Sequence, residues 1–121
     1  MKKLIRAIVV DDESNSRDIL AHLLMLDGNI TVLSKCQNIV EAMDAIAEFK
    51  PDLLFLDIEM PGGSGFELIE RLSKTEFNPA VVFVTAYNQY AIKAIKYAAF
   101  DYLLKPIDLD EIGRASCRER V

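Results

Sequence analysis

Five short apolar stretches alternate with five amphipathic stretches along the chain, and this alternation limits the fold more than any other feature of the sequence. Nearly continuous apolar stretches predict strands that are buried on both faces of a sheet. Apolar residues at helical spacing predict helices that cover those faces. The predicted strands are residues 4–10, 30–36, 52–57, 80–85 and 100–104, and the predicted helices are residues 14–26, 39–49, 66–73, 89–98 and 108–112. We therefore expect an α/β fold with a doubly wound, five-stranded parallel sheet.

The composition is that of one globular domain. The chain has 121 residues, 51% of them apolar, and no apolar run approaches the roughly 18–20 residues that cross a bilayer. The net charge of −5 argues against direct binding of nucleic acid, because phosphates attract basic surfaces. Cys36 and Cys117 have no Cys or His nearby at the spacing of a zinc site, so we expect reduced thiols. We expect a cytoplasmic domain without membrane contact.

The last nine residues, 113–121, differ in character from the rest of the chain. They show no apolar period and bring three arginines into an acidic chain, and without them the net charge is −7. Residues 111–121 resemble the translation of a sequencing-adapter oligonucleotide. We therefore expect residues 113–121 to be a non-native tail that truncates the fifth helix. The alternative is an ordinary basic helix end, and the sequence of the encoding DNA distinguishes the two.

Four of the five predicted strands end in polar or ionisable side chains. Asp11 and Asp12 follow the first strand, Asp57 the third, Thr85 the fourth and Lys105 the fifth. The carboxyl ends of parallel strands share one edge of the sheet, and such folds bind their ligands there. Carboxylates that meet at this edge repel one another unless a cation lies between them, and Mg²⁺ takes oxygen ligands of this kind. With a lysine and a hydroxyl nearby, the set suits phosphoryl transfer to a carboxylate.

Asp57 is the candidate for that nucleophilic carboxylate. It ends a predicted strand that is apolar from residue 53 to residue 56. A carboxylate at the end of a buried strand lowers stability, which indicates that the residue has a function. Gly62, Gly63 and Gly65 follow it. Because glycine has no Cβ, the loop that contains them can stay close to the site without side-chain clashes.

The motifs at the strand ends resemble those of the receiver domain of two-component response regulators. They are Asp11-Asp12, Asp57-Ile58-Glu59-Met60-Pro61-Gly62, Thr85-Ala86 and Lys105-Pro106. Each motif alone is weak, but their joint spacing is specific, and the resemblance covers residues 4–112. It implies the flavodoxin-like receiver fold with strand order 2-1-3-4-5, with residues 1–112 as the receiver domain.

The resemblance also implies roles for the acidic residues. Asp57 corresponds to the phosphoacceptor. The cofactor is Mg²⁺, which is implied to bind directly to Asp12, to Asp57 and to the backbone carbonyl of Glu59. Asp11 is implied to act mainly through a metal-bound water.

The residues at the ends of the fourth and fifth strands are implied to contact the phosphoryl group. Thr85 and Ala86 correspond to the residues that bind its oxygens, and Lys105 to the lysine that pairs with the phosphoacceptor or its phosphate. Pro106 follows a cis peptide bond in this family. Tyr102 matches the switch residue whose ring turns between outward and inward rotamers as Thr85 moves.

Glu59 and Tyr87 each lie two residues beyond a residue of the predicted site, Asp57 and Thr85 respectively. In this fold such positions flank the phosphoryl group and control the approach of water. We predict that both residues tune the lifetime of the acyl phosphate. His22, between apolar positions of the first helix, is assigned no role.

Residues 85–94 and 100–108 resemble receivers that are fused to LytTR-type (LytR/AlgR-like) DNA-binding domains. The resemblance implies transcription regulation, a sensor histidine kinase as the phosphodonor and a C-terminal output domain that is absent from this segment. It also implies a homodimer through helix four, strand five and helix five. The apolar residues between 91 and 98 are interpreted mainly as a helix stripe that faces the core. A second interpretation is that they also form a surface for a partner.

Two other functions stay open. A pseudo-receiver scaffold binds proteins without being phosphorylated, but such domains usually lack one of the acids or the lysine. A Mg²⁺-dependent aspartyl phosphohydrolase has paired acids like Asp57 and Glu59, but haloacid dehalogenase-like enzymes place them on the first strand and usually have Asp at the second position. Because a receiver catalyses only its own phosphorylation and dephosphorylation, we do not expect an enzyme in the usual sense.

Overall fold

The computed structural model describes residues 4–119, with side chains described through residue 114. Its elements alternate along the chain: β1 (Ile5–Val10), α1 (Ser14–Asp27), β2 (Ile30–Cys36), α2 (Ile39–Phe49), β3 (Leu53–Leu56), α3 (Gly65–Leu72), β4 (Ala80–Thr85), α4 (Ala91–Lys96), β5 (Asp101–Leu104) and α5 (Leu109–Glu119). The strands form one parallel sheet in the order β2-β1-β3-β4-β5. This confirms the predicted fold class and the strand order that the resemblance implied.

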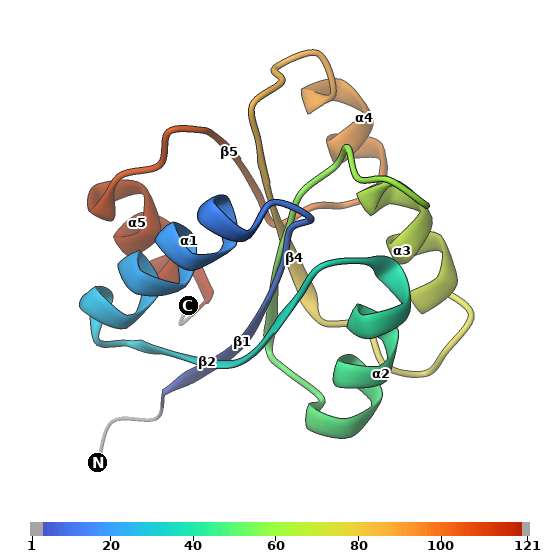
Figure 1. Cartoon of the computed structure of the whole chain (residues 1–121), viewed down its shortest axis with the longest axis horizontal. Coiled ribbons are helices and arrows are strands. Elements are labelled where there is room, and N and C mark those ends of the chain that lie inside the picture. The colour runs from blue at the N-terminus through green and yellow to red at the C-terminus, as the bar shows by residue number, and fades with distance from the viewer. Residues whose placement is uncertain (1–3, 120–121) are drawn as a thin grey trace.

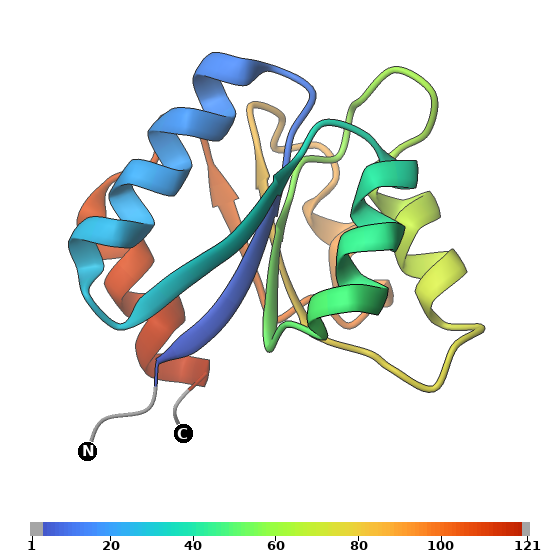
Figure 2. The same ribbon diagram turned by 60° about the horizontal axis from the view of Figure 1, so that its bottom comes forward.

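Helices cover both faces of the sheet. In Figure 1, α1 and α5 lie together on one face, and α2, α3 and α4 lie on the other; Figure 2 shows the same layers from a turned view. Phe55 belongs to the core cluster under α1 and α5, and Phe83 to the cluster under the other three helices. The central strand β3 is buried along its whole length, which explains why its sequence is apolar at every position.

Local sequence signals set the ends of the first two helices. Asn38 caps α2, since its side chain accepts a hydrogen bond from the N–H of Glu41 at 2.8 Å. The same helix ends at Lys50, whose φ of +47° is left-handed, directly before Pro51. Gly28, with a φ of +79°, ends α1 in the same conformation. Each of these residue types is a common helix-end signal, so the local sequence explains where the first two helices end.

Helix α4 is shorter than the sequence predicted. The prediction covered residues 89–98, but Ala98 has a left-handed φ of +57° and α4 spans only Ala91–Lys96. Ile92 and Ile95 are 73% and 76% exposed, and Ala94 is the buried residue of this helix. The expectation of a core-facing stripe is therefore wrong for both isoleucines. Ala94 belongs to the same core cluster as Phe66, and Tyr97 packs against that cluster with its ring centroid 4.9 Å from that of Phe66.

Helix α5 continues beyond the predicted stop at residue 112 and reaches Glu119. The expectation that the tail interrupts this helix is therefore wrong, because residues 113–119 have helical backbone. Arg114, within those residues, lies 3.4 Å from the Asp101 carboxylate of β5. The expectation that residues 113–121 are non-native concerns their origin and stays a prediction.

No helix within the described range 4–119 has both the length and the apolar character needed to cross a bilayer.

Candidate functional site

The carboxyl ends of four adjacent strands bring the predicted site residues together. The N–H of Asp57 donates to the carbonyl of Val10 at 2.9 Å, so the residue after β3 is joined to β1. The N–H of Lys105 donates in the same way to the carbonyl of Thr85 at 2.8 Å, joining the residue after β5 to β4. These bonds extend the sheet by one residue at each strand end. They fix the backbone positions from which the side chains of Asp57 and Lys105 extend.

Three carboxylates meet at this edge, as the strand ends predicted. Oxygen atoms of Asp11, Asp12 and Asp57 all lie within 4.8 Å of one another. Asp11 and Asp57 are only 2% and 7% exposed, whereas Asp12 is exposed. Asp11 is oriented further by the N–H of Glu13, which donates to its Oδ1 at 2.9 Å. Buried carboxylates at such separations favour a cation between them.

Lys105 supplies a positive charge to this cluster. Its Nζ lies 2.8 Å from Oδ2 of Asp11 and 3.3 Å from Oδ2 of Asp57. The resemblance implied a pairing with Asp57 or its phosphate; the ammonium bridges both carboxylates and lies closer to Asp11. The peptide bond between Lys105 and Pro106 is cis, as the resemblance implied.

Burial and neighbouring charges alter the protonation of this group. Burial raises the pKa of Asp57 above its ordinary value; the Lys105 ammonium opposes this rise, and the Asp11 carboxylate adds to it. Burial lowers the pKa of Lys105, but its hydrogen bond to Asp11 and the charges of both carboxylates outweigh that effect, so the pKa is raised overall. The ammonium therefore stays charged at neutral pH, while ionised Asp57 is held in an unfavourable environment.

The donor set fits a hard divalent cation. With all three carboxylates ionised and Lys105 protonated, the group has two negative charges in excess, which is the charge that one such ion neutralises. The donors are carboxylate oxygens, and Mg²⁺ prefers oxygen ligands over nitrogen or sulfur. Asp11, Asp12 and Asp57 are thus the residues that could hold Mg²⁺.

The loop from β3 to α3 passes very close to Asp57. The N–H of Ile58 donates to Oδ1 of Asp57 at 2.7 Å, and the N–H of Gly65 donates to the carbonyl of Ile58 at 2.8 Å. A Cβ on Gly65 would lie 2.5 Å from the carbonyl oxygen of Asp57, which is far inside van der Waals contact. Gly62 contributes differently, through a left-handed φ of +85° with open space around it. The expected freedom from side-chain clash is therefore confirmed at Gly65.

Thr85 is fully buried beside this group, and its Oγ1 accepts a hydrogen bond from the N–H of Tyr87 at 3.3 Å. Ala86, between these two residues, is exposed. The hydroxyl of Tyr102 donates to the backbone carbonyl of Tyr87, so the predicted switch residue contacts the loop that follows Thr85. Its ring centroid lies 6.3 Å from that of Phe83 in β4.

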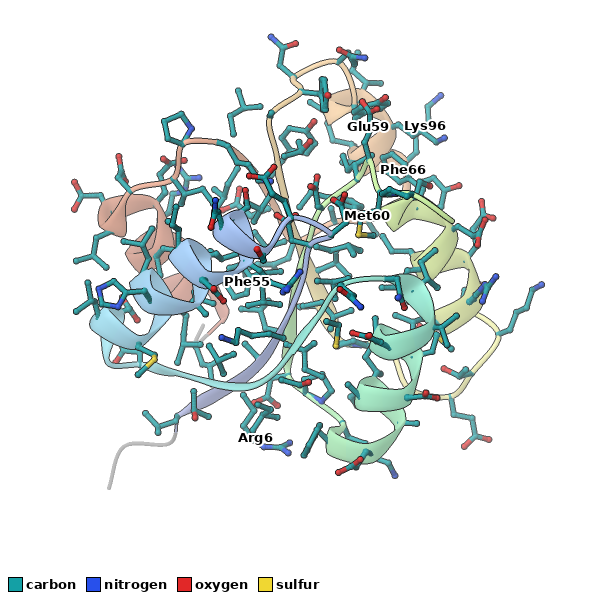
Figure 3. All side chains as sticks on the ribbon, in the orientation of Figure 1. Arg6, Phe55, Glu59, Met60, Phe66 and Lys96 are labelled. Atoms are coloured by element: carbon teal, nitrogen blue, oxygen red, sulfur yellow. The ribbon has the colours of Figure 1, made fainter. Side chains whose placement is uncertain are left out.

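Sequence reasoning missed Tyr90, the residue that precedes α4. Its hydroxyl donates to Oε2 of Glu59 at 2.9 Å, across 31 positions of the chain. Figure 3 shows Glu59 beside α4, with Phe66 close to it. The sequence has no local signal for this contact, because its two residues lie 31 positions apart.

Comparison with known proteins assigns the family. A family model described as the response regulator receiver domain matches residues 7–116. The chain belongs to this family. The receiver is 45% identical to the sensory transduction protein LytT of Bacillus subtilis over 109 residues, which are 90% of this chain and 45% of that protein. It is 43% identical to the transcriptional regulatory protein BtsR of Escherichia coli K12 over 117 residues, 97% of this chain and 48% of that protein.

These relatives confirm the LytTR-type subfamily that the sequence predicted. The receiver spans about half the length of the curated relatives it matches. Among solved structures, it is similar to the response regulator TrrA from Thermotoga maritima in complex with Mg²⁺-BeF, with a TM-score of 0.84 and 32% identity over 96% of this chain and 99% of that chain. The response regulatory domain of mrkE from Klebsiella pneumoniae gives a TM-score of 0.85 at 27% identity, over 96% of this chain and 95% of that chain.

Proposed function

We propose that this receiver accepts a phosphoryl group on Asp57 from the phosphohistidine of a sensor histidine kinase, with Mg²⁺ as its cofactor. The observation that carries the proposal is the placement of Lys105, whose ammonium lies 2.8 Å from Asp11 and 3.3 Å from Asp57. An ammonium held between a metal-binding acid and a nucleophilic acid is suited to bind a phosphoryl oxygen. Mg²⁺ would be held by Asp12, Asp57 and the Glu59 backbone carbonyl, with Asp11 acting mainly through a water molecule.

The transfer step follows from this placement. A carboxylate oxygen of Asp57 attacks phosphorus, and the bond from phosphorus to the donor nitrogen breaks, with its electron pair leaving on the donor. Lys105 binds one phosphoryl oxygen, and the hydroxyl of Thr85 donates to another. Ala86, the residue after Thr85, also contacts the phosphoryl oxygens. Mg²⁺, when bound, neutralises charge on the phosphoryl oxygens and orients the donor.

Hydrolysis ends the signal. A water oxygen attacks phosphorus, the bond from phosphorus to the Asp57 oxygen breaks, and inorganic phosphate leaves as the carboxylate is restored. Glu59 and Tyr87 line a hollow of about 430 Å³ together with Met60, Pro61 and Ser64, and they control the approach of that water. The domain thus catalyses only its own phosphorylation and dephosphorylation, and it is not an enzyme in the usual sense.

Phosphorylation switches an output in a longer, cytoplasmic protein, a LytTR-type transcription regulator whose DNA contacts are made outside this segment. We place its homodimer interface on α4, β5 and α5. Ile92, Ile95 and Leu104 support this, because they are 73%, 76% and 42% exposed on that side of the receiver. Movement of Thr85 and Tyr102 would couple the site to this surface.

Intact-mass spectrometry after incubation with Mg²⁺ and acetyl phosphate tests the proposal. We expect a gain of one phosphoryl group, about 80 Da, that requires Mg²⁺ and is absent in Asp57→Asn. Asp18→Asn, which changes an exposed carboxylate on α1, is the matched control and should gain the group. An unmodified wild-type chain would favour the pseudo-receiver scaffold, and repeated turnover of a generic phosphate ester would favour the aspartyl phosphohydrolase.

A further inference from the structure

The side chain of Glu59 is held by a different element from the one that contains it. Glu59 lies in the loop after β3, and its Oε2 accepts a hydrogen bond from the hydroxyl of Tyr90, the N-cap residue of α4, at 2.9 Å. Figure 3 shows the Glu59 side chain beside α4. The acceptor also raises the pKa of the Tyr90 hydroxyl, so this group stays protonated and remains the donor.

The Tyr90 ring is fixed independently of that hydrogen bond. It packs edge-on against Phe66 and Tyr87, at centroid distances of 6.1 Å and 6.2 Å. Its backbone carbonyl accepts the N–H of Ala94 at 2.9 Å, which ties it to the first turn of α4. The hydroxyl position is therefore set by packing, and the exposed Glu59 carboxylate adapts to it.

Glu59 lines the hollow described above, and the other lining residues, Met60, Pro61, Ser64 and Tyr87, are uncharged. The hollow adjoins the loop that begins at Asp57. Phosphodonors are anions, and they approach a site that already contains three carboxylates and the Lys105 ammonium. A fourth carboxylate that faced the donor would repel it.

We propose that Tyr90 is a positioning residue, which draws the Glu59 carboxylate toward α4 and so keeps its charge out of the path of an incoming anionic phosphodonor. The inference rests on the proposed phosphoryl transfer to Asp57 and extends it to the selection of donors.

The variant Tyr90→Phe isolates the hydroxyl, because the ring keeps its contacts with Phe66 and Tyr87. Without the Tyr90 hydroxyl, the Glu59 carboxylate is released from α4 and can face the incoming phosphodonor. The acetyl phosphate concentration that gives half the maximal phosphorylation rate should then rise by about threefold or more at low ionic strength, with the maximal rate unchanged. The rise should shrink as salt is added, and it should be smaller for phosphoramidate, which is less negative at neutral pH.

Two comparisons separate positioning from general stabilisation of α4. Tyr97→Phe is the matched control. The hydroxyl of Tyr97, the C-cap residue of α4, also donates to a glutamate, Glu70 of α3, and its ring also packs on Phe66. That variant should leave the half-saturating concentration at the wild-type value. In a Glu59→Gln background, Tyr90→Phe should add nothing, because the side chain that is released has no charge.

Stopped-flow or intact-mass kinetics with the 121-residue chain give a clear result in each case. A salt-sensitive rise for Tyr90→Phe that is absent in Tyr97→Phe and in the Glu59→Gln background supports the proposal. A wild-type value for Tyr90→Phe, or equal effects of the two tyrosine variants, overturns it while leaving the phosphoacceptor function intact. A wild-type chain that gains no phosphoryl group at all overturns both proposals, and the wild-type reaction alone reveals that case.

Discussion

Gly65→Ala should destabilise the receiver and disturb Asp57. Gly65 is the first residue of α3, and a Cβ there would lie 2.5 Å from the carbonyl oxygen of Asp57 and 3.1 Å from Cγ of Leu56. The first of these atoms belongs to the backbone of a strand end, which is held by the hydrogen bond from the Asp57 N–H to Val10 at 2.9 Å. It cannot move aside as the tip of a long side chain could.

The magnitude follows from two opposing effects. Overpacking a well-ordered region costs about 1–3 kcal/mol. Replacing glycine by alanine in a helix recovers at most about 1 kcal/mol. The free energy of unfolding should therefore fall by about 1–2 kcal/mol, which lowers the Tm of a domain of this size by roughly 4–8 °C.

Urea denaturation followed by circular dichroism measures the change, and Gly113→Ala is the control. Among the side chains that the structure describes, a Cβ on Gly113 would meet only Oδ1 of Asp27, at 3.8 Å, an ordinary contact distance. Gly113 lies inside α5, so alanine there should raise the free energy of unfolding by about 0.5–1 kcal/mol. Equal effects of the two substitutions, or a more stable Gly65→Ala, would refute the reasoning from close approach.

Two further predictions concern the ionisation of buried groups. Because the folded-state pKa of Asp57 is raised above the ordinary value of 3.8, its ionisation destabilises the fold as pH rises through the interval between these two values. Asp57→Asn should therefore have a higher Tm than wild type at pH 7 in EDTA, and the difference in Tm should disappear as pH falls below 3.8. A variant that is less stable than wild type at pH 7 would contradict this expectation. Burial raises the pKa of the Cys36 thiol, and the residue is 2% exposed. In a Cys117→Ser background, iodoacetamide at pH 8 should therefore label Cys36 about 100-fold more slowly in the native chain than in urea. Equal rates would show that the thiol is accessible.

The convergence of the site residues was predictable because it depends on strand ends alone. Asp57 and Lys105 each follow a predicted strand, and a parallel sheet places such residues at one edge whatever their side-chain contacts. The alternation of strands and helices is compatible with more than one strand order, so the order 2-1-3-4-5 came from the resemblance. The position of Lys105 between two acids depends on side-chain packing, and the resemblance implied only one of the two partners.

The misassigned isoleucines of α4 and the missed contact of Tyr90 share a physical cause, which is that a local pattern does not reveal distant neighbours. An apolar period identifies residues that can share a helix face, but it does not reveal whether anything covers that face. Ile92 and Ile95 were therefore assigned to the core, although Ala94 is the buried residue of α4 and both isoleucines face solvent. The contact of Tyr90 with Glu59 joins positions 31 residues apart, and no local pattern encodes such a pair.

The backbone bonds from Asp57 to Val10 and from Lys105 to Thr85 have a consequence for how such domains diversify. These amides exchange with solvent only when the sheet itself opens, whereas α4 has six residues and a single buried side chain and opens far more readily. Substitutions can therefore accumulate in α4 with little effect on the strand ends. Descendants of one ancestral gene can acquire new partners on that helix while the reactive centre is inherited unchanged.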